Sequence, residues 1–169
     1  MTAEKISLTE FSAFTGENEY PKLWLKYQAG ERSLCGFNFW AFILGIGWFI
    51  YRKLYIQGIV IFLIEVASVY SFSFALAALT QYVPNIFTEA SVGYFIAGFY
   101  FLTAITAGFW ANIALYKKAI RTIREADALD VDNETYLHII KSIGGVNIPA
   151  AICTCGAIAM INFVVLHRQ

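Results

Sequence analysis

The stretch LYIQGIVIFLIEVASVYSFSFALAAL, residues 54–79, is predominantly apolar and contains one charged side chain, Glu65. A helix needs about 20 such residues to cross the hydrocarbon core of a bilayer. Residues 90–116 and 146–166 meet the same requirement. The sequence therefore predicts an all-α polytopic membrane protein with three transmembrane helices.

The composition of the whole chain supports this prediction. Of its 169 residues, 59% are hydrophobic and 14% are charged, and the net charge at pH 7 is zero. A soluble domain usually carries about 25% charged residues, so we expect membrane lipid to surround the apolar segments. A chain with no excess of positive charge lacks the field that attracts nucleic acid. We therefore expect no nucleic-acid partner.

The distribution of lysine and arginine predicts which connections face the cytoplasm. Residues 80–89 contain neither, whereas residues 117–143 contain Lys117, Lys118, Arg121, Arg124 and Lys141. Because cytoplasmic loops are enriched in these residues, we expect 117–143 to be a cytoplasmic helical loop. Residues 1–34 are polar and lack an apolar export signal, which predicts a cytoplasmic N-terminal segment ahead of a membrane domain at 35–166.

Residues 37–51, FNFWAFILGIGWFIY, form a segment too short for a comfortable crossing. In this topology both ends of the segment lie on the cytoplasmic side, so we expect an interfacial or re-entrant helical hairpin broken at Gly45 and Gly47. Aromatic and basic side chains favour the headgroup layer of a membrane. They predict a membrane-interface anchor made of Trp40, Trp48, Tyr51, Arg52 and Lys53. Four transmembrane helices, with the N-terminus outside, are the alternative.

Glu65 lies about 18 Å beyond Lys53 along a helix, near the middle of the bilayer. A carboxyl group at that depth is costly and marks a candidate functional position. Polar residues at similar depth extend it to a candidate intramembrane polar site of Glu65, Ser68, Thr103, Thr106 and Thr154. Such a site binds a cation or relays a proton, or else its carboxyl group donates a hydrogen bond between helices. We favour the structural interpretation, because a lone carboxyl group makes a poor transport pathway.

Small residues line one face of the predicted span at 90–116: Gly93, Ala97, Ala104, Gly108 and Ala111. Such a face lets helix backbones approach closely in a membrane. We expect it to pack within the monomer, and a seam between copies of the chain is the alternative. Asn112 lies on the same side of this helix, where it can cap or bridge helices.

Catalytic motifs are missing from the sequence. It contains no glycine-rich phosphate loop, no zinc-protease histidine pair and no serine-nucleophile elbow. Cys153 and Cys155 have no histidine or carboxylate nearby with which to hold a metal. We therefore predict that the protein is not an enzyme and has no catalytic residues, no metal and no cofactor.

Between residues 14 and 55 the chain carries a specific pattern of aromatic, glycine and basic residues. Its positions are Phe14, Gly16, Asn18, Trp24, Phe37, Asn38, Ala41, Phe42, Gly45, Trp48, Phe49, Tyr51, Arg52, Lys53 and Tyr55. This pattern resembles domain of unknown function 2628, a family of small bacterial inner-membrane proteins. Ile46 stands where the family frequently has proline, and Leu54 where it has methionine. The resemblance implies a multi-pass protein of a bacterial inner membrane, and no catalytic residue carries over from it.

These observations favour a non-enzymatic membrane component that regulates or recruits a partner, or that acts in immunity or defence. Its expected partners are membrane lipid and either a second copy of the chain or another protein at the cytoplasmic face. The alternative is a small oligomeric channel or transporter with Glu65 in its pathway.

Overall fold

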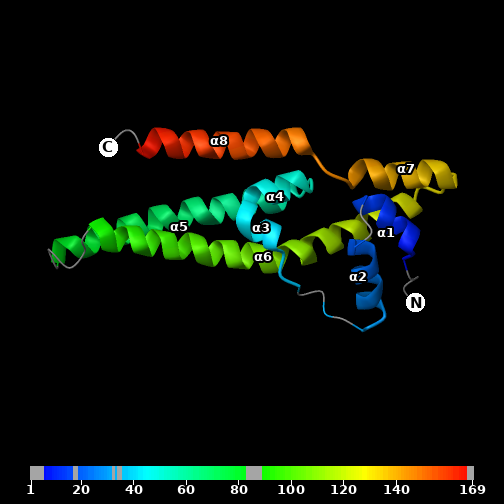
Figure 1. Cartoon of the computed structure of the whole chain (residues 1–169), viewed down its shortest axis with the longest axis horizontal. Helices are drawn as coiled ribbons and strands as arrows, with labels where there is room; N and C mark the ends of the chain where they lie inside the picture. Colours follow the sequence, from blue (N-terminus) through cyan, green and yellow to red (C-terminus); the bar gives the residue numbers. More distant parts are fainter. Residues whose placement is uncertain (1–5, 17–18, 32, 34–35, 83–88, 167–169) are drawn as a thin grey trace.

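The computed structural model describes residues 6–16, 19–31, 33, 36–82 and 89–166. Within this part of the chain every regular element is a helix, which confirms the all-α prediction (Figure 1). The helices are α1 (Leu8–Thr15), α2 (Glu19–Gln28), α3 (Phe39–Leu44), α4 (Ile46–Tyr51), α5 (Tyr55–Tyr82), α6 (Glu89–Asp127), α7 (Asn133–Ile143) and α8 (Ile148–Leu166).

The helices form two regions with different surfaces. We call α5, α8 and residues 89–116 of α6 the arm, and we call α1, α2, α7 and residues 117–127 of α6 the headpiece. Figure 1 shows α5 and α6 side by side along the arm, while α1, α2 and α7 gather around the far end of α6. The short helices α3 and α4 lie where the two regions join, with α3 packed on α6 and α4 packed on α5 and α8.

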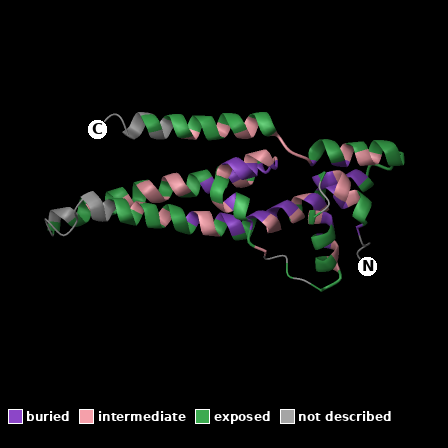
Figure 2. Ribbon diagram, viewed as in Figure 1, coloured by how far each residue is buried: buried purple, intermediate pink, exposed green. Residues whose placement is uncertain are grey.

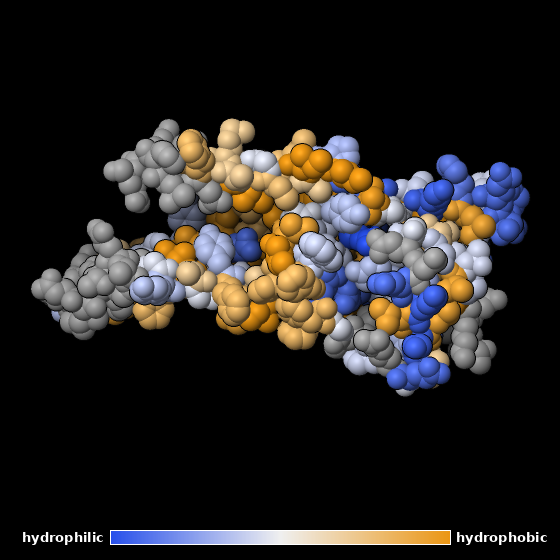
Figure 3. Space-filling view, viewed as in Figure 1, coloured by the Kyte–Doolittle hydropathy of each residue, from blue (hydrophilic) through white to orange (hydrophobic). Residues whose placement is uncertain are grey.

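Three helices are long and apolar enough to cross a membrane, as predicted. The candidate spans cover 55–79, 93–127 and 133–160. The last of these includes α7, but α7 ends at Ile143, so α8 supplies its apolar part. Only 6% of the apolar window in the first and third spans is buried inside the protein. Figure 3 accordingly shows apolar residues along the arm and hydrophilic residues over the headpiece, a distribution that fits an integral membrane protein.

The predicted span at 90–116 continues as one helix to Asp127. The added turns are charged on the outside and apolar on one side. Ala119 is fully buried and Ile123 is 3% exposed, so this side of α6 packs into the headpiece. The predicted helical loop at 117–143 is thus the end of α6, a short connection and α7.

The segment at 37–51 forms two short helices, with a break between them at Gly45, whose φ angle is +50°. Gly47, the second predicted breaker, lies inside α4 and is buried. A Cβ atom at Gly47 would lie 2.7 Å from the Sγ atom of Cys155 on α8. Gly47 therefore provides close packing between α4 and α8, and the turn depends on Gly45.

The headpiece contains a core of aromatic side chains from the N-terminal segment, which the sequence analysis treated as a polar stretch. Phe11 and Phe14 on α1 are 0% and 1% exposed, and Trp24 on α2 is 3% exposed. The Trp24 ring packs edge-on against Phe11 and against Tyr116 of α6, with centroid distances of 5.1 and 5.6 Å. Figure 2 shows buried residues concentrated in the headpiece and at its junction with the arm.

A hydrogen bond between helices that are far apart in sequence joins α1 to α7. The Tyr136 hydroxyl donates to a Glu10 carboxylate oxygen at 2.5 Å, and the Ser7 backbone N–H donates to the other oxygen at 2.6 Å. Burial raises the pKa of Glu10, but the hydrogen bonds from Tyr136 and Ser7 outweigh it, so the pKa lies below its ordinary value of 4.5. The ionised carboxylate thus stabilises the headpiece at pH values above the pKa that Glu10 has in the unfolded chain. This stabilisation is lost as pH falls through the lower pKa that Glu10 has in the folded protein.

We expect Tyr136→Phe to lower the unfolding temperature at pH 7 and to have a smaller effect at acid pH, below the lowered pKa of Glu10. At low pH the protonated Glu10 no longer accepts the charge-assisted bond that the variant removes. Thermal unfolding of both proteins between pH 3 and pH 7 measures this difference. A temperature difference that stays constant over the whole range would contradict the assigned role of Glu10.

Candidate functional site

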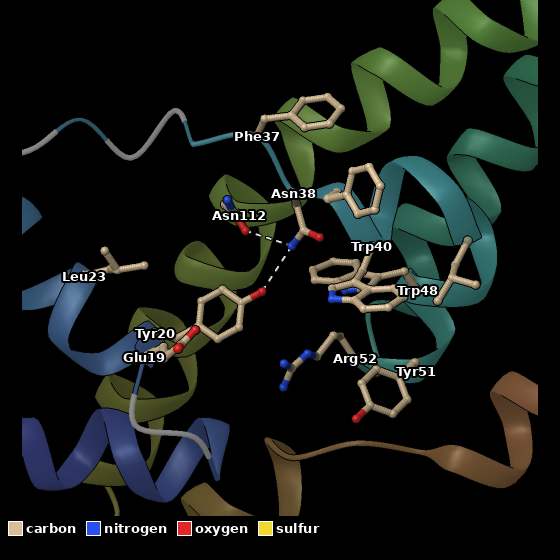
Figure 4. A pocket seen from close by; sticks show the side chains of 12 residues that line it. Glu19, Tyr20, Leu23, Phe37, Asn38, Trp40, Trp48, Tyr51, Arg52 and Asn112 are labelled. Atoms are coloured by element: carbon tan, nitrogen blue, oxygen red, sulfur yellow. Dashed lines mark hydrogen bonds between the residues drawn. The ribbon is translucent and has the colours of Figure 1, made fainter.

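A pocket of about 520 Å³ lies at the junction of headpiece and arm (Figure 4). Its walls come from α2, from the chain entering α3, from α3 and α4, and from α6. The lining residues are Glu19, Tyr20, Leu23, Phe37, Asn38, Phe39, Trp40, Leu44, Trp48, Tyr51, Arg52 and Asn112. Among the described residues, the pocket therefore combines aromatic rings, two amide side chains, one guanidinium and one carboxylate.

Arg52 directly follows α4 and is only 5% exposed, although it carries a charge. Its guanidinium carbon lies 5.2 Å from the centre of the Tyr20 ring and 5.4 Å from that of Tyr51. A guanidinium over a ring face is attracted to the negative charge of the π system. These two contacts orient Arg52 within the pocket, where Figure 4 shows it between the two tyrosines.

Asn38 links three of the pocket walls. Its Oδ1 atom accepts from the Ala41 backbone N–H at 2.9 Å and so caps α3. Its Nδ2 atom donates to the Tyr20 hydroxyl at 3.1 Å and to Asn112 Oδ1 at 2.9 Å. Asn112 in turn donates to the Gly36 carbonyl at 2.7 Å. This network joins α2, α3 and α6 around the pocket and confirms that Asn112 bridges helices.

The lysine next to Arg52 has a different role. Lys53 has a positive φ angle of 56°, and its ammonium group donates to the Ser142 carbonyl at 2.8 Å. Lys118 on α6 donates to the carbonyl groups of Lys53 at 3.1 Å and Ile143 at 3.3 Å. These bonds tie the connection between α4 and α5 to the end of α7 and so fix the headpiece against the base of the arm.

Four of the five predicted anchor residues line this same pocket. Trp40 is 64% exposed and lies at its edge, and Tyr51 is half-buried. Trp48 is 3% exposed and, like Arg52, lies within the protein. Lys53 does not line the pocket. Sequence reasoning did not single out Glu19, Tyr20 or Asn38 as site residues. The only available signal was that Asn38 belongs to the family-like pattern and that Glu19 and Tyr20 lie beside it.

The predicted intramembrane polar site is only partly assembled. The half-buried Glu65 on α5 lies beside Thr103 on α6, but the Thr103 hydroxyl donates to the Tyr100 carbonyl of its own helix at 2.9 Å. The hydroxyl groups of Thr106 and Thr154 donate to carbonyl groups of their own helices, at Thr103 and Ala150, both at 2.8 Å. Thr154 lies on α8, which packs on α4. Ser68 lines a separate groove of about 340 Å³ between α5 and α6, where its neighbours are mainly aromatic and aliphatic.

The predicted packing face of α6 divides into two halves. Gly108 and Ala111 are buried near the junction, and a Cβ atom at Gly108 would lie 2.5 Å from the Phe37 ring. Ala104 is half-buried, whereas Gly93 and Ala97 are exposed on the arm. The junction half therefore packs within the monomer, next to the pocket.

The family comparison covers every residue of the pocket. The model of the family described as Protein of unknown function (DUF2628) matches residues 4–121, and the pocket is lined by residues between 19 and 112. No curated protein and no solved structure matches the chain. Because the family match extends over more than half of the sequence, the chain belongs to this family of proteins of unknown function.

Proposed function

We propose that this protein is a non-enzymatic, multi-pass component of a bacterial inner membrane that recruits a protein partner to the cytoplasmic leaflet. The arm anchors the chain in lipid, and the headpiece provides the binding surface. The family resemblance supports the bacterial inner membrane. The concentration of lysine and arginine at 117–143 supports a cytoplasmic headpiece.

One observation carries this proposal, namely that the largest fully buried side chains lie mainly in the headpiece and at its junction with the arm. Phe11, Phe14 and Ile140 are almost completely buried in the headpiece, whereas the candidate spans of α5 and α8 are almost unburied. A membrane anchor alone does not need such a folded unit, because lipid stabilises its helices. A rigid headpiece is, however, what a docking surface requires.

The outer face of α2 supplies a surface of suitable chemistry. Leu23 and Tyr27 are 37% and 40% exposed, and they lie one helical turn apart. Lys22 and Lys26, also exposed and one turn apart, run beside them. Apolar side chains flanked by lysine favour an acidic protein segment with apolar residues of its own. We propose such a segment as the partner.

Photo-crosslinking in intact cells tests this proposal. A photoreactive phenylalanine analogue at Tyr27 should give a discrete protein adduct. The analogue is itself aromatic, so it can keep the contact that the Tyr27 ring makes with Tyr116. The combined charge reversal Lys22→Glu and Lys26→Glu should reduce the yield at least fivefold by repelling an acidic partner. Lys141→Glu, an exposed charge reversal on α7, is the matched control and should leave the yield unchanged.

An adduct whose yield is the same in all three proteins would contradict docking through α2. The channel alternative instead predicts that the arm conducts ions. Its candidate pathway is the region where Glu65 lies near Thr103, beside a groove of about 220 Å³. Ion flux into vesicles that vanishes in Glu65→Gln would replace our proposal with that alternative.

A further inference from the structure

We propose that the junction pocket binds the headgroup of a zwitterionic phospholipid, with Arg52 contacting its phosphate and Glu19 its primary ammonium group. A lipid headgroup of this kind and its soluble counterpart share one chemical feature, a phosphate joined to a short cationic amine. This inference rests on the proposed function only in placing the headpiece at the membrane surface. It assigns a ligand to the pocket, whereas docking assigns a partner to the outer face of α2.

The position of the pocket matches the depth of lipid headgroups. Its lining residues come from the junction, where the apolar arm meets the hydrophilic headpiece; Figure 3 shows the two kinds of surface. The α3 side chains at its edge are exposed and apolar, with Phe39 at 59%, Trp40 at 64% and Leu44 at 45%. Aromatic residues of this kind favour the boundary between headgroups and acyl chains. A lipid with its headgroup in the pocket would therefore have its chains beside α3 and the arm.

Arg52 provides the phosphate contact. A guanidinium has five N–H donors in a planar fork, so it can contact a phosphate and another acceptor together. The rings of Tyr20 and Tyr51 hold this fork, with centroid distances of 5.2 and 5.4 Å. Because the side chain is already ordered and only 5% exposed, binding costs little further conformational entropy.

The charges on the pocket walls favour a zwitterionic lipid over an anionic one. Among the described residues that line the pocket, Arg52 is the one cation and Glu19 the one anion. A phosphate with a primary ammonium group is neutral overall and can satisfy both side chains. An anionic headgroup without an amine would satisfy Arg52 but would meet repulsion from Glu19. The tyrosine and tryptophan rings of the wall also attract an ammonium group.

The test measures lipid retention by the full-length protein with native mass spectrometry. The purified protein is exchanged into mixtures of phosphatidylethanolamine and phosphatidylglycerol with identical acyl chains. The wild type should retain phosphatidylethanolamine about tenfold better, the ratio expected for one charge-assisted contact. Glu19→Gln should remove this preference, because it deletes the charge that contacts the ammonium group and changes only an exposed side chain. Glu31→Gln, an exposed change outside the pocket, is the matched control.

Arg52→Gln should reduce retention of both lipids about tenfold, and its thermal unfolding curve shows whether the buried position still folds. If this variant does not fold, the Glu19→Gln ratio alone decides the proposal. Soluble O-phosphoethanolamine serves as the second arm and should not displace the lipid at equal concentration, because it lacks acyl chains. Displacement at equal concentration would make the ligand a soluble phosphate compound and overturn the lipid assignment.

Equal retention of the two lipids by the wild type, Glu19→Gln and Glu31→Gln would overturn the inference. Crosslinking at Tyr27 keeps the two proposals separate. If pocket variants lose lipid selectivity while the adduct remains, docking does not depend on the lipid. If the adduct is never seen while lipid selectivity follows Glu19, recruitment fails and the lipid site stands.

Discussion

Replacing Gly144 with alanine is expected to destabilise the headpiece by about 3 kcal/mol, the upper part of the range for overpacking a core. A Cβ atom at Gly144 would overlap the Phe14 carbonyl oxygen, and it would lie 2.9 Å from both the carbonyl carbon and the Cα atom of Phe14. These are backbone atoms of α1, which no rotamer change can move. The neighbouring Gly145 N–H donates to the same carbonyl group at 2.7 Å, so relief of the clash would also break this bond.

Gly98→Ala is the matched control, because it adds the same methyl group to a helical glycine with nothing within 4 Å. Alanine is the better helix former, so this change should be neutral or slightly stabilising. Thermal unfolding followed by tryptophan fluorescence measures both effects, with buried Trp24 reporting on the headpiece. If Gly144→Ala unfolds at the wild-type temperature, then α1 and α7 do not meet at Gly144.

The arm was predictable because lipid imposes a local requirement. Each span must be apolar over a length set by the bilayer, and this length is visible in any window of sequence. The predicted span at 54–79 therefore matches α5 at Tyr55–Tyr82, and the one at 146–166 matches α8 at Ile148–Leu166. The break at Gly45 was also local, since its positive φ angle suits glycine.

The headpiece was not predictable in the same way. Helices α1 and α2 have 8 and 10 residues, too short to be stable without tertiary packing. Their packing comes from partners far away in sequence, such as Tyr136 for Glu10. Nothing near residue 10 in the sequence identifies Tyr136 as its partner. The aromatic residues of 1–34 thus looked like scattered apolar positions in a polar segment.

Depth in the membrane did not predict which polar residues meet. Glu65 and Thr103 were expected at similar depth, and the pairing of α5 with α6 brings them together. Thr154 was expected at that depth too, but its hydroxyl bonds within α8, which packs on α4. The burial of Arg52 also depends on contacts between segments that are far apart in sequence. Its guanidinium packs against Tyr20 of α2, and the sequence did not predict where α2 lies.

The second large effect is expected for Asn38→Ala, at about 3 kcal/mol. This change removes the cap of α3, worth about 1 kcal/mol. It also removes the hydrogen bonds from Asn38 Nδ2 to Tyr20 and to the half-buried Asn112, each worth about 1 kcal/mol. Thermal or denaturant unfolding measures the loss. Asp132→Ala is the matched control, since Asp132 caps α7 in the same way, with Oδ2 accepting from the Thr135 N–H at 3.0 Å, but on an exposed surface.

The comparison of the two caps separates local capping from the network around the pocket. If the network stabilises the junction, Asn38→Ala costs about 2 kcal/mol more than Asp132→Ala. Asn112→Ala then costs less in the Asn38→Ala background than in the wild type, where it removes both the Asn38 bond and the bond to the Gly36 carbonyl. Additive losses from Asn38→Ala and Asn112→Ala would show that the two amides stabilise the fold separately. Equal losses from the two cap variants would reduce Asn38 to an ordinary helix cap. Packing between α3 and α6 alone would then determine the shape of the pocket, and the hydrogen bonds of Asn38 would not be needed to hold α2 against these two helices.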